Sequence, residues 1–306
     1  MIYSMDLWSF AILGLVFVAT MLVAGNNLSA CIGPAVGSRI ITKRFGILLG
    51  SAGFTAGLLL QGPFMQQSVS TLLPHTTALL RTEALVVAIV VFVVAFLLRA
   101  PMSLNMSLVG MLAGLNFASN SSGNSNFIGE VVITWVAVPL LAFGLAFYFL
   151  RFLNKGWPKN FWRRLQAYKI LLIILSFSAA YVTGANTMGM IVATGGFDVA
   201  AILAAITAIF AGCLFLSEGA IRRISEELFL MRYANATATL LISSVLLEFA
   251  TVLNIPLSIT QSTSSAVFGT GLSYGTKFVS AKPFLKIAAG WIIAPLLSFS
   301  IGYLVG

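Results

Sequence analysis

Long runs of apolar residues, separated by short polar stretches, cover most of the 306-residue chain. A helix that crosses the hydrocarbon core of a bilayer needs roughly 20 predominantly apolar residues. Such runs lie at 7–24, 45–62, 83–99, 127–150, 169–183, 199–217, 234–253 and 284–305. The pattern therefore predicts an all-α, polytopic membrane protein.

Two further segments, 100–118 and 255–275, are apolar but rich in Ser, Asn, Thr and Gly. A proline stands near the start of each, at Pro101 and Pro256. If both segments cross the bilayer once, the chain makes about ten crossings, although the sequence leaves open whether they turn back instead. Polar interruptions at 25–38 and 184–197 predict two more broken helices at the midplane.

The charges of the loops predict the orientation, because basic residues collect in cytoplasmic loops. We expect Arg99 on the inside of the membrane. The uncharged stretch 119–126 is expected on the outside. Both termini are then expected outside a plasma membrane that the chain crosses many times. The remaining basic loops, all expected inside, lie at 39–44, 151–169, 222–232 and 277–286.

The composition excludes several classes of protein. Hydrophobic residues make up 59% of the chain, charged residues only 8%, and the mean hydropathy is +1.02. A soluble domain has about 25% charged residues, so a soluble enzyme and a disordered chain are both excluded. The formal net charge of +9 comes without a nucleic-acid-binding motif, so no nucleic-acid partner is expected. The basic, aromatic-rich segment 151–168 is expected to lie on anionic lipid.

Residues that support enzymatic or metal chemistry are scarce. The chain has one histidine and two cysteines, and no nucleotide-binding loop of the GxxxxGK[ST] type. No cluster of acids and histidines and no Ser–His pair stands within the apolar runs. We therefore expect no enzyme, no metal site and no cofactor.

Two polar signatures occur twice, in the same order. Asn26 and Asn186 are 160 residues apart, and Pro101 and Pro256, which open PMSLNMS and PLSITQS, are 155 apart. Each half contains about five crossings, and an odd number inverts the second copy. Inverted repeats with interrupted helices are typical of secondary transporters. The predicted units are a first repeat (1–150), a basic cytoplasmic linker (151–168) and a second repeat (169–306).

These motifs resemble those of the inorganic phosphate transporter (PiT) family, which carries duplicated G-A-N-D-V-A-N and P-x-S-T-T motifs. The sequences GAN at 184–186 and PLSIT at 256–260 are similar to the second copies. The first copies are more divergent. Asn27 and Thr187 stand where the family has aspartate. The resemblance implies a phosphate transporter, and the missing aspartates count against sodium coupling.

A tetrahedral oxyanion needs hydroxyl, amide and backbone N–H donors, which a helix N-terminus supplies together with a favourable dipole. The family favours phosphate as the substrate. The loss of both aspartates favours sulfate, which carries no proton to share with a carboxylate, and an uncoupled anion channel is a third hypothesis. The residues predicted to bind the anion are Asn26, Asn27, Ser103, Asn105, Ser107, Asn186, Thr187, Ser258, Thr260, Gln261, Ser262 and Thr263.

Glu248 stands in an otherwise largely apolar run. A charge there costs roughly 2.5–3.5 kcal/mol or more, so we predict that Glu248 carries a coupling proton. The alternatives are a permanently protonated structural carboxyl and coupling to sodium. The small-residue segments would also permit a homodimer.

Overall fold

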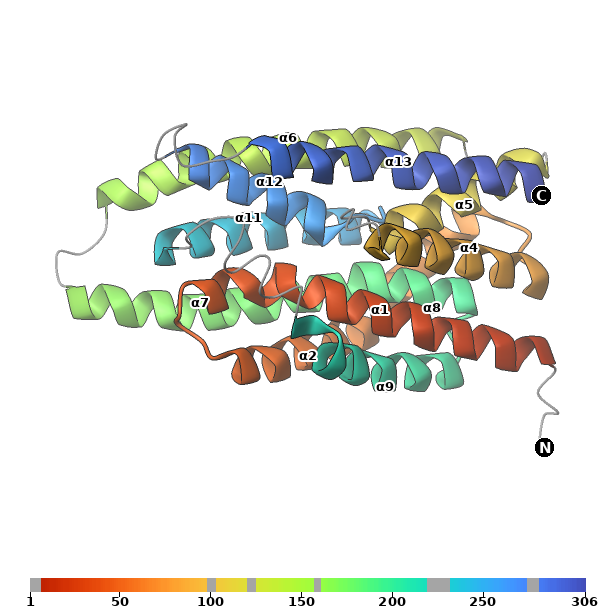
Figure 1. Cartoon of the computed structure of the whole chain (residues 1–306), viewed down its shortest axis with the longest axis horizontal. Coiled ribbons are helices and arrows are strands. Elements are labelled where there is room, and N and C mark those ends of the chain that lie inside the picture. The colour runs from red at the N-terminus through yellow and green to blue at the C-terminus, as the bar shows by residue number, and fades with distance from the viewer. Residues whose placement is uncertain (1–6, 98–102, 120–124, 157–160, 219–231, 274–280) are drawn as a thin grey trace.

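A computed structural model describes residues 7–97, 103–119, 125–156, 161–218, 232–273 and 281–306 (Figure 1). Every regular element in these ranges is a helix, which confirms the predicted all-α class. The predictions for Arg99, Pro101, Arg222, Arg223, Lys277 and most of 119–126 lie outside these ranges. The helices are α1 (Leu7–Gly37), α2 (Lys43–Leu60), η1 (Gly62–Phe64), α3 (Met65–Leu72), α4 (Ala78–Leu97), α5 (Leu104–Ala118), α6 (Ser125–Gly156), α7 (Phe161–Thr183), η2 (Gly184–Met188), α8 (Gly189–Gly195), α9 (Val199–Phe215), α11 (Tyr233–Val252), α12 (Ile259–Leu272) and α13 (Ala281–Val305).

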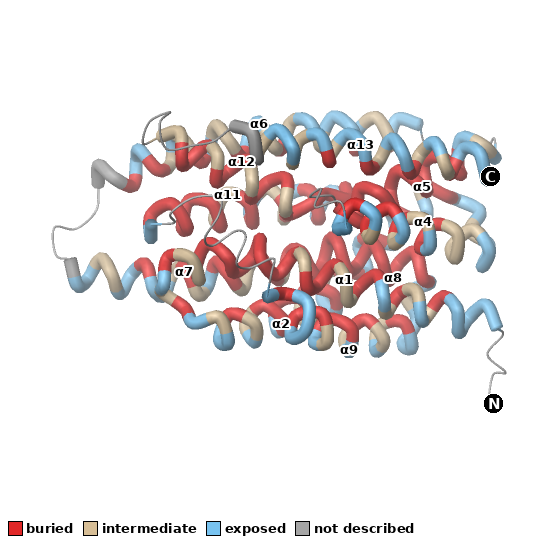
Figure 2. The backbone as a smooth tube through the Cα atoms, viewed as in Figure 1, coloured by how far each residue is buried: buried red, intermediate tan, exposed pale blue. Residues whose placement is uncertain are grey.

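Six described helices are long and apolar enough to cross a membrane, and a seventh span results if α2 and the bent continuation through α3 count as one. This confirms a polytopic membrane protein. Side chains that face outward are largely apolar, and buried positions concentrate inside the bundle (Figure 2). Serine, threonine and asparagine are frequent among the buried residues, so the core of the bundle is more polar than the surface that meets lipid.

Within the predicted segments 100–118 and 255–275, the described helices α5 and α12 turn back and do not cross. In Figure 1, α4 runs from the end that carries the termini to the middle of the molecule, and α5 returns beside it. α11 enters from the opposite end, and α12 returns along it. α5 and α12 have 15 and 14 residues, or about 21–23 Å, which is too short for a core of about 30 Å. The expectation of ten crossings is therefore wrong. α4 with α5 and α11 with α12 form two hairpins, in which the second helix adds no crossing.

The predicted breaks at 25–38 and 184–197 are absent. α1 continues to Gly37, and 162–195 form one helical span that contains a single π turn, η2. The glycines there serve close packing: a Cβ at Gly184 would collide with the backbone of Phe54. The true interruptions are the non-helical residues at 253–258, where Asn254 has a positive φ of 57°, and the start of α5.

The second half of the chain runs opposite to the first. α1 and α6 lead away from the end that carries the termini, whereas α7–α8 and α13 lead toward it, and both termini lie at that end (Figure 1). The close contacts repeat with the same spacing. A Cβ at Gly114 of α5 would meet the carbonyl of Phe299, and one at Gly269 of α12 would meet the carbonyl of Phe143. The two glycines are 155 residues apart and the two phenylalanines 156, so these are equivalent contacts.

Each hairpin therefore packs on the last helix of the other repeat, α5 on α13 and α12 on α6. Two further large contacts also cross between repeats. α1 packs on α9 where Gly212 faces Met21, and α2 packs on α7 where Gly53 faces Ala180. The two glycines, and likewise Met21 and Ala180, are separated by 159 positions between the repeats. The two halves are interlocked along their length.

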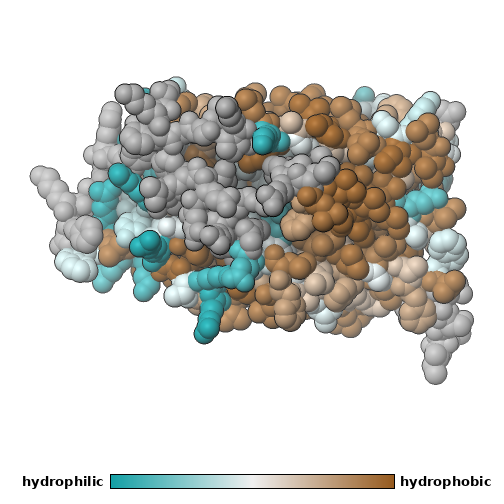
Figure 3. All heavy atoms as spheres, in the orientation of Figure 1, coloured by the Kyte–Doolittle hydropathy of each residue, from teal (hydrophilic) through white to brown (hydrophobic). Residues whose placement is uncertain are grey.

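Basic side chains gather at the end opposite the termini. Figure 3 shows hydrophilic atoms mostly toward that end and hydrophobic atoms over much of the remaining described surface. This distribution is the one predicted for a cytoplasmic end. The described basic residues on or near the helix portions at that end are Lys43, Arg44, Arg151, Arg163, Arg164, Lys169, Arg232 and Lys286.

Candidate oxyanion site

The N-termini of α5 and α12 meet near the middle of the molecule (Figure 1). Ser103 and Ser258 are the N-caps, with nearly identical extended backbones: φ −109°, ψ 121° and φ −97°, ψ 122°. Neither side chain caps its own helix, although a serine at this position usually bonds to a first-turn N–H. Both hydroxyls are buried, and first-turn N–H groups of two helices remain available to a ligand.

Asn186 in the π turn holds the tip of the second hairpin. Its Nδ2 donates to Thr251 Oγ1 at 3.1 Å and to the carbonyl of Ile255 at 2.9 Å. Its Oδ1 accepts from the N–H of Leu257 at 2.9 Å. The side chain is fully buried, so these bonds fix the non-helical backbone before Ser258.

Asn105 brings the first hairpin to the same place. Its Nδ2 lies 3.1 Å from the carbonyl of Leu257 and 3.4 Å from Asn186 Oδ1. The first hairpin, the π turn and the second hairpin therefore meet through Asn105, Leu257 and Asn186. The prediction that these segments converge agrees with this geometry.

The other predicted residues differ in their contacts. Ser258 and Thr260 share a hydrogen bond of 2.7 Å. Ser107 bonds back to the carbonyl of Ser103 at 3.4 Å, which is the ordinary structural role of a helical serine. Asn26 Nδ2 donates to Asn27 Oδ1 at 3.2 Å, and α1 packs on α12.

Several buried polar atoms near the hairpin tips have no hydrogen-bond partner. A buried unsatisfied group costs about 1–3 kcal/mol, and native structures keep few of them. A cluster of such atoms indicates a place that a polar ligand completes. Within the described part of the chain they include Asn105 Oδ1, Thr187 Oγ1, Gln261 Oε1, Ser262 Oγ and Thr263 Oγ1.

A groove of about 640 Å³ lies between α6 and α13, with α5 and α12 at its floor. Its walls are almost wholly apolar, and Gln261 and Ser265 are its polar side chains. Val136 and Ile292 beside it are largely exposed, so the groove opens toward lipid. Gln261 thus lines this apolar groove as well as standing near the hairpin tips.

Glu248 makes a contact that the sequence did not predict. Gln61 Nε2 donates to Glu248 Oε1 at 2.7 Å, whereas Glu248 Oε2 and Gln61 Oε1 have no partner. Gln61 stands at the 51° bend between α2 and η1–α3. The Gln-Gly-Pro sequence at 61–63 marks this bend, but the pairing joins residues 187 positions apart.

Two more residues that support the tip of the second hairpin were not predicted from the sequence. Thr251 supports Asn186, and Trp135 Nε1 donates to the carbonyl of Pro256 at 2.9 Å. Trp135 extends from α6, the last helix of the first repeat, to the hairpin of the second. Nothing local in the sequence distinguishes these residues from packing residues.

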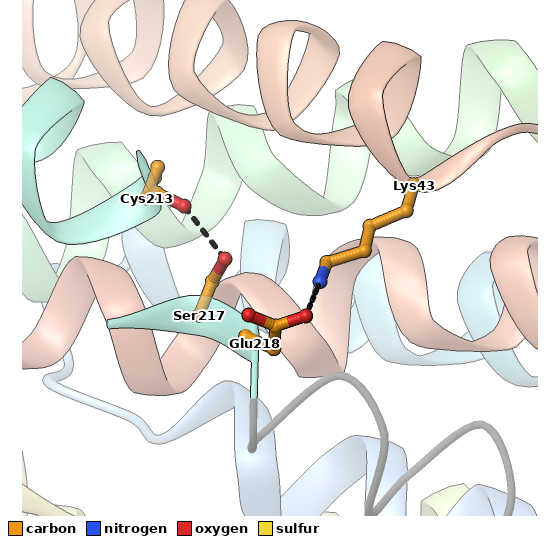
Figure 4. Close-up of polar contacts among 4 residues, drawn as sticks. All are labelled: Lys43, Cys213, Ser217 and Glu218. Atoms are coloured by element: carbon orange, nitrogen blue, oxygen red, sulfur yellow. Dashed lines mark hydrogen bonds and ion pairs between the residues drawn. The ribbon is translucent and has the colours of Figure 1, made fainter. Parts of the chain in front are cut away.

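The charged groups described at the basic end lie away from this site. Lys43 Nζ and Glu218 Oε1 are 2.6 Å apart and connect the start of α2 to the end of α9, next to the bond from Ser217 to the Cys213 carbonyl (Figure 4). The hydrogen bond and charge of Lys43 lower the pKa of the exposed Glu218 carboxyl. Within the described ranges, no group of three His, Cys, Asp or Glu side chains could hold a metal ion.

An all-helical membrane protein whose inverted halves bring two helix N-termini together has the architecture of a secondary transporter. The sequence matches the Phosphate transporter family over residues 23–183 and 158–302. The chain belongs to that family.

The chain is similar to one protein named as a phosphate permease and to another named as a sulfate permease. It is 26% identical to the "Putative phosphate permease MJ0630" of Methanocaldococcus jannaschii over 295 residues, which cover 94% of each protein. It is 28% identical to the sulfate permease CysP of Bacillus subtilis over 303 residues, 93% of this chain and 83% of the relative. A solved structure titled "The sodium-dependent phosphate transporter" shares the fold, with a TM-score of 0.79, 16% identity, and coverage of 98% and 100% of the two chains.

Proposed function

We propose that the protein is a proton-coupled secondary transporter that carries inorganic phosphate by alternating access around the hairpin tips. The observation that carries the proposal is the meeting of two helix N-termini whose N-cap hydroxyls, Ser103 and Ser258, are buried and do not cap their helices. The positive ends of the two helix dipoles and the first-turn backbone N–H groups favour an anion. The inverted repeats supply two equivalent gates.

Sulfate is the second candidate, because none of the predicted anion-binding residues is acidic. Phosphate near neutral pH keeps a proton that a carboxylate could accept, whereas sulfate keeps none. Asn27 and Thr187 replace the aspartates of the motif, and both are buried. The sulfate permease among the relatives supports this alternative.

The coupling proton would reside on Glu248. A protonated Oε2 could donate a hydrogen bond where the structure leaves that atom unpartnered. The contact with Gln61 links α11, which leads to one hairpin tip, with the bend of α2. Sodium is the alternative coupling ion. In the proposed orientation, the basic end faces the cytoplasm and both termini lie outside.

The test is uptake of radiolabelled phosphate and of sulfate into proteoliposomes, with the sodium and pH gradients varied separately. Concentrative uptake of phosphate that a pH gradient drives supports the proposal, whereas such uptake of sulfate alone supports the second candidate. Uptake that only follows the anion gradient supports a channel, and dependence on sodium alone overturns proton coupling.

Single-residue variants locate the site. Ser103→Ala and Ser258→Ala should abolish uptake while the protein remains folded in the membrane. Ser300→Ala is the matched control, because that exposed serine only bonds back to the Leu296 carbonyl. Normal uptake in both hairpin variants would refute the site.

A further inference from the structure

One face of α11 carries polar side chains that the central site does not use. Asn235, Thr239 and Ser243 follow at intervals of four residues, so they line a single stripe. The stripe starts at the basic end, where α11 begins, and runs toward the hairpin tip (Figure 1). It therefore connects the basic end with the candidate oxyanion site.

All three side chains are completely buried, and their polar atoms have no hydrogen-bond partner among the described residues. In Asn235 both the donor and the acceptor of the amide are unsatisfied. The usual structural role of helical serine and threonine is available on the same helix, since Ser244 and Thr251 bond to carbonyls four residues earlier. Thr239 and Ser243 do not use it.

The inverted repeat offers an internal comparison for this face. With the spacing of 155 that relates the hairpins, the equivalent residues of α4 are Leu80, Ala84 and Ala88. Ala84 and Ala88 are fully buried, and α4 packs on α5 and α1 as α11 packs on α12 and α7. Apolar side chains thus satisfy the packing of this position, and the polar stripe on α11 needs another explanation.

A further unsatisfied hydroxyl lies on a neighbouring helix. Ser176 of α7 is completely buried and has no partner, and α7 packs along α11. Buried hydroxyl and amide groups of this kind cost free energy until something bonds to them. Hydroxyl and amide donors without a nearby carboxylate on the stripe suit an oxyanion.

We propose that the stripe Asn235–Thr239–Ser243 is a transit site for the oxyanion, which it binds between the hairpin tips and the basic end. This deepens the proposed function and rests on it. The site is closed in the present conformation and opens when the helices around α11 separate at the basic end. Its ligand is the same tetrahedral oxyanion that the central site holds.

Cysteine labelling tests the site directly. Thr239→Cys is made in a background with Cys31→Ala and Cys213→Ala, and proteoliposomes are treated with an anionic, membrane-impermeant methanethiosulfonate. The reagent should modify the introduced thiol only from the basic end, and saturating phosphate or sulfate should slow the modification about tenfold. Ala84→Cys, at the equivalent position of α4, is the control and should show no such protection. Modification that neither anion slows, or the absence of modification, overturns the transit site.

Transport measurements give a second readout. Thr239→Val and Ser243→Ala should lower the uptake rate about tenfold and leave equilibrium binding of the labelled anion by purified protein unchanged. Ser298→Ala, which removes a buried, unpartnered hydroxyl from α13, is the control and should transport normally. Unchanged uptake in both stripe variants contradicts the proposal.

The two proposals fail in different ways. If Ser258→Ala abolishes uptake while anions leave the labelling of the Thr239→Cys protein unchanged, only the transit site is wrong. If the unmodified protein takes up neither phosphate nor sulfate and purified protein binds neither anion, the proposed function itself is wrong.

Discussion

Asn186 joins both repeats with one side chain. It accepts from the N–H of Leu257, donates to Thr251 and Ile255, and lies within 3.4 Å of Asn105. Its contribution is therefore structural as well as chemical, because the free N-terminus of α12 depends on the backbone that it holds.

Replacing Asn186 should affect stability and binding together. Asn186→Ala leaves buried backbone groups of Ile255 and Leu257 unsatisfied, which costs about 1–3 kcal/mol for each group. We expect a lower melting temperature in detergent and loss of anion binding. Thr187→Ala removes a hydroxyl that has no protein partner, and should weaken binding with little change in melting temperature. Equal melting temperatures for Asn186→Ala and the unmodified protein would contradict the role of the amide.

Glu248 should be required for coupling and not for anion binding. Glu248→Gln retains an oxygen that can accept the bond from Gln61 but removes the carboxyl group that we propose for coupling. We expect the pH gradient to lose its effect on uptake while phosphate–phosphate exchange continues. Glu218→Gln changes an exposed carboxyl and is the control. Stimulation by a pH gradient that persists in Glu248→Gln excludes this role.

The sequence predicted that the two hairpins and the segment around Asn186 come together, because their motifs occur twice with constant spacing, and Asn105 and Asn186 do meet at the Leu257 backbone. It could not assign roles within the set. Ser107 bonds to its own helix, and Gln261 also lines the lipid-facing groove. The partners Gln61 and Thr251 depend on contacts between distant segments, which a local pattern does not encode.

At the scale of the element, the apolar lengths predicted the main spans but not the hairpins. A half-length helix and a crossing helix have similar amino-acid composition. In the second repeat only the turn before α12 shows that the helix belongs to a hairpin. The glycine-rich stretches also misled the prediction, because glycine permits close helix packing as well as breaks. Gly184 makes such a contact inside a continuous span.

The packing of α12 on α6 provides a test of the hairpin. Gly269→Ala places a methyl group against the carbonyl of Phe143, and backbone atoms there cannot move easily. We expect a destabilisation of about 1–3 kcal/mol and loss of uptake. Gly144→Ala is the matched control on α6, since a Cβ there has nothing within 4 Å, and its thermal stability should be unchanged or slightly higher. Normal stability of Gly269→Ala would mean that the two helices are not in close contact.

The ion pair between α2 and α9 should depend on pH. Lys43 lowers the pKa of Glu218 below its ordinary value of 4.5, so the stabilisation is present above that value and disappears as the pH falls through the lowered pKa. Glu218 is largely exposed and Lys43 partly exposed, so the effect is small and salt-sensitive. The melting temperatures of the unmodified protein and Glu218→Gln should differ slightly at pH 7 in low salt and converge on acidification. A difference that persists in strong acid contradicts the ion pair as its cause.

At the scale of the whole molecule, all the described bases on helix ends other than Arg81 lie at the end opposite the termini. We expect the thiol of Arg151→Cys to react with an impermeant reagent only from the cytoplasm, and that of Leu304→Cys only from outside. Leu304 is exposed and close to the C-terminus. Labelling of both positions from the same side would contradict the arrangement in which the termini and the basic end lie on opposite faces.

The packing of each hairpin on the last helix of the other repeat has a consequence for biosynthesis. α5 ends at Ala118, and α13, on which it packs, begins at Ala281, 163 positions later. At about 5–20 residues per second, a ribosome needs roughly 10–30 s to make the chain between them. During that interval the glycine face of α5 lies against lipid or against a temporary partner. The packing face of α5 is therefore covered only when α13 has been made, and a chain truncated before α13 should be sent to membrane quality control.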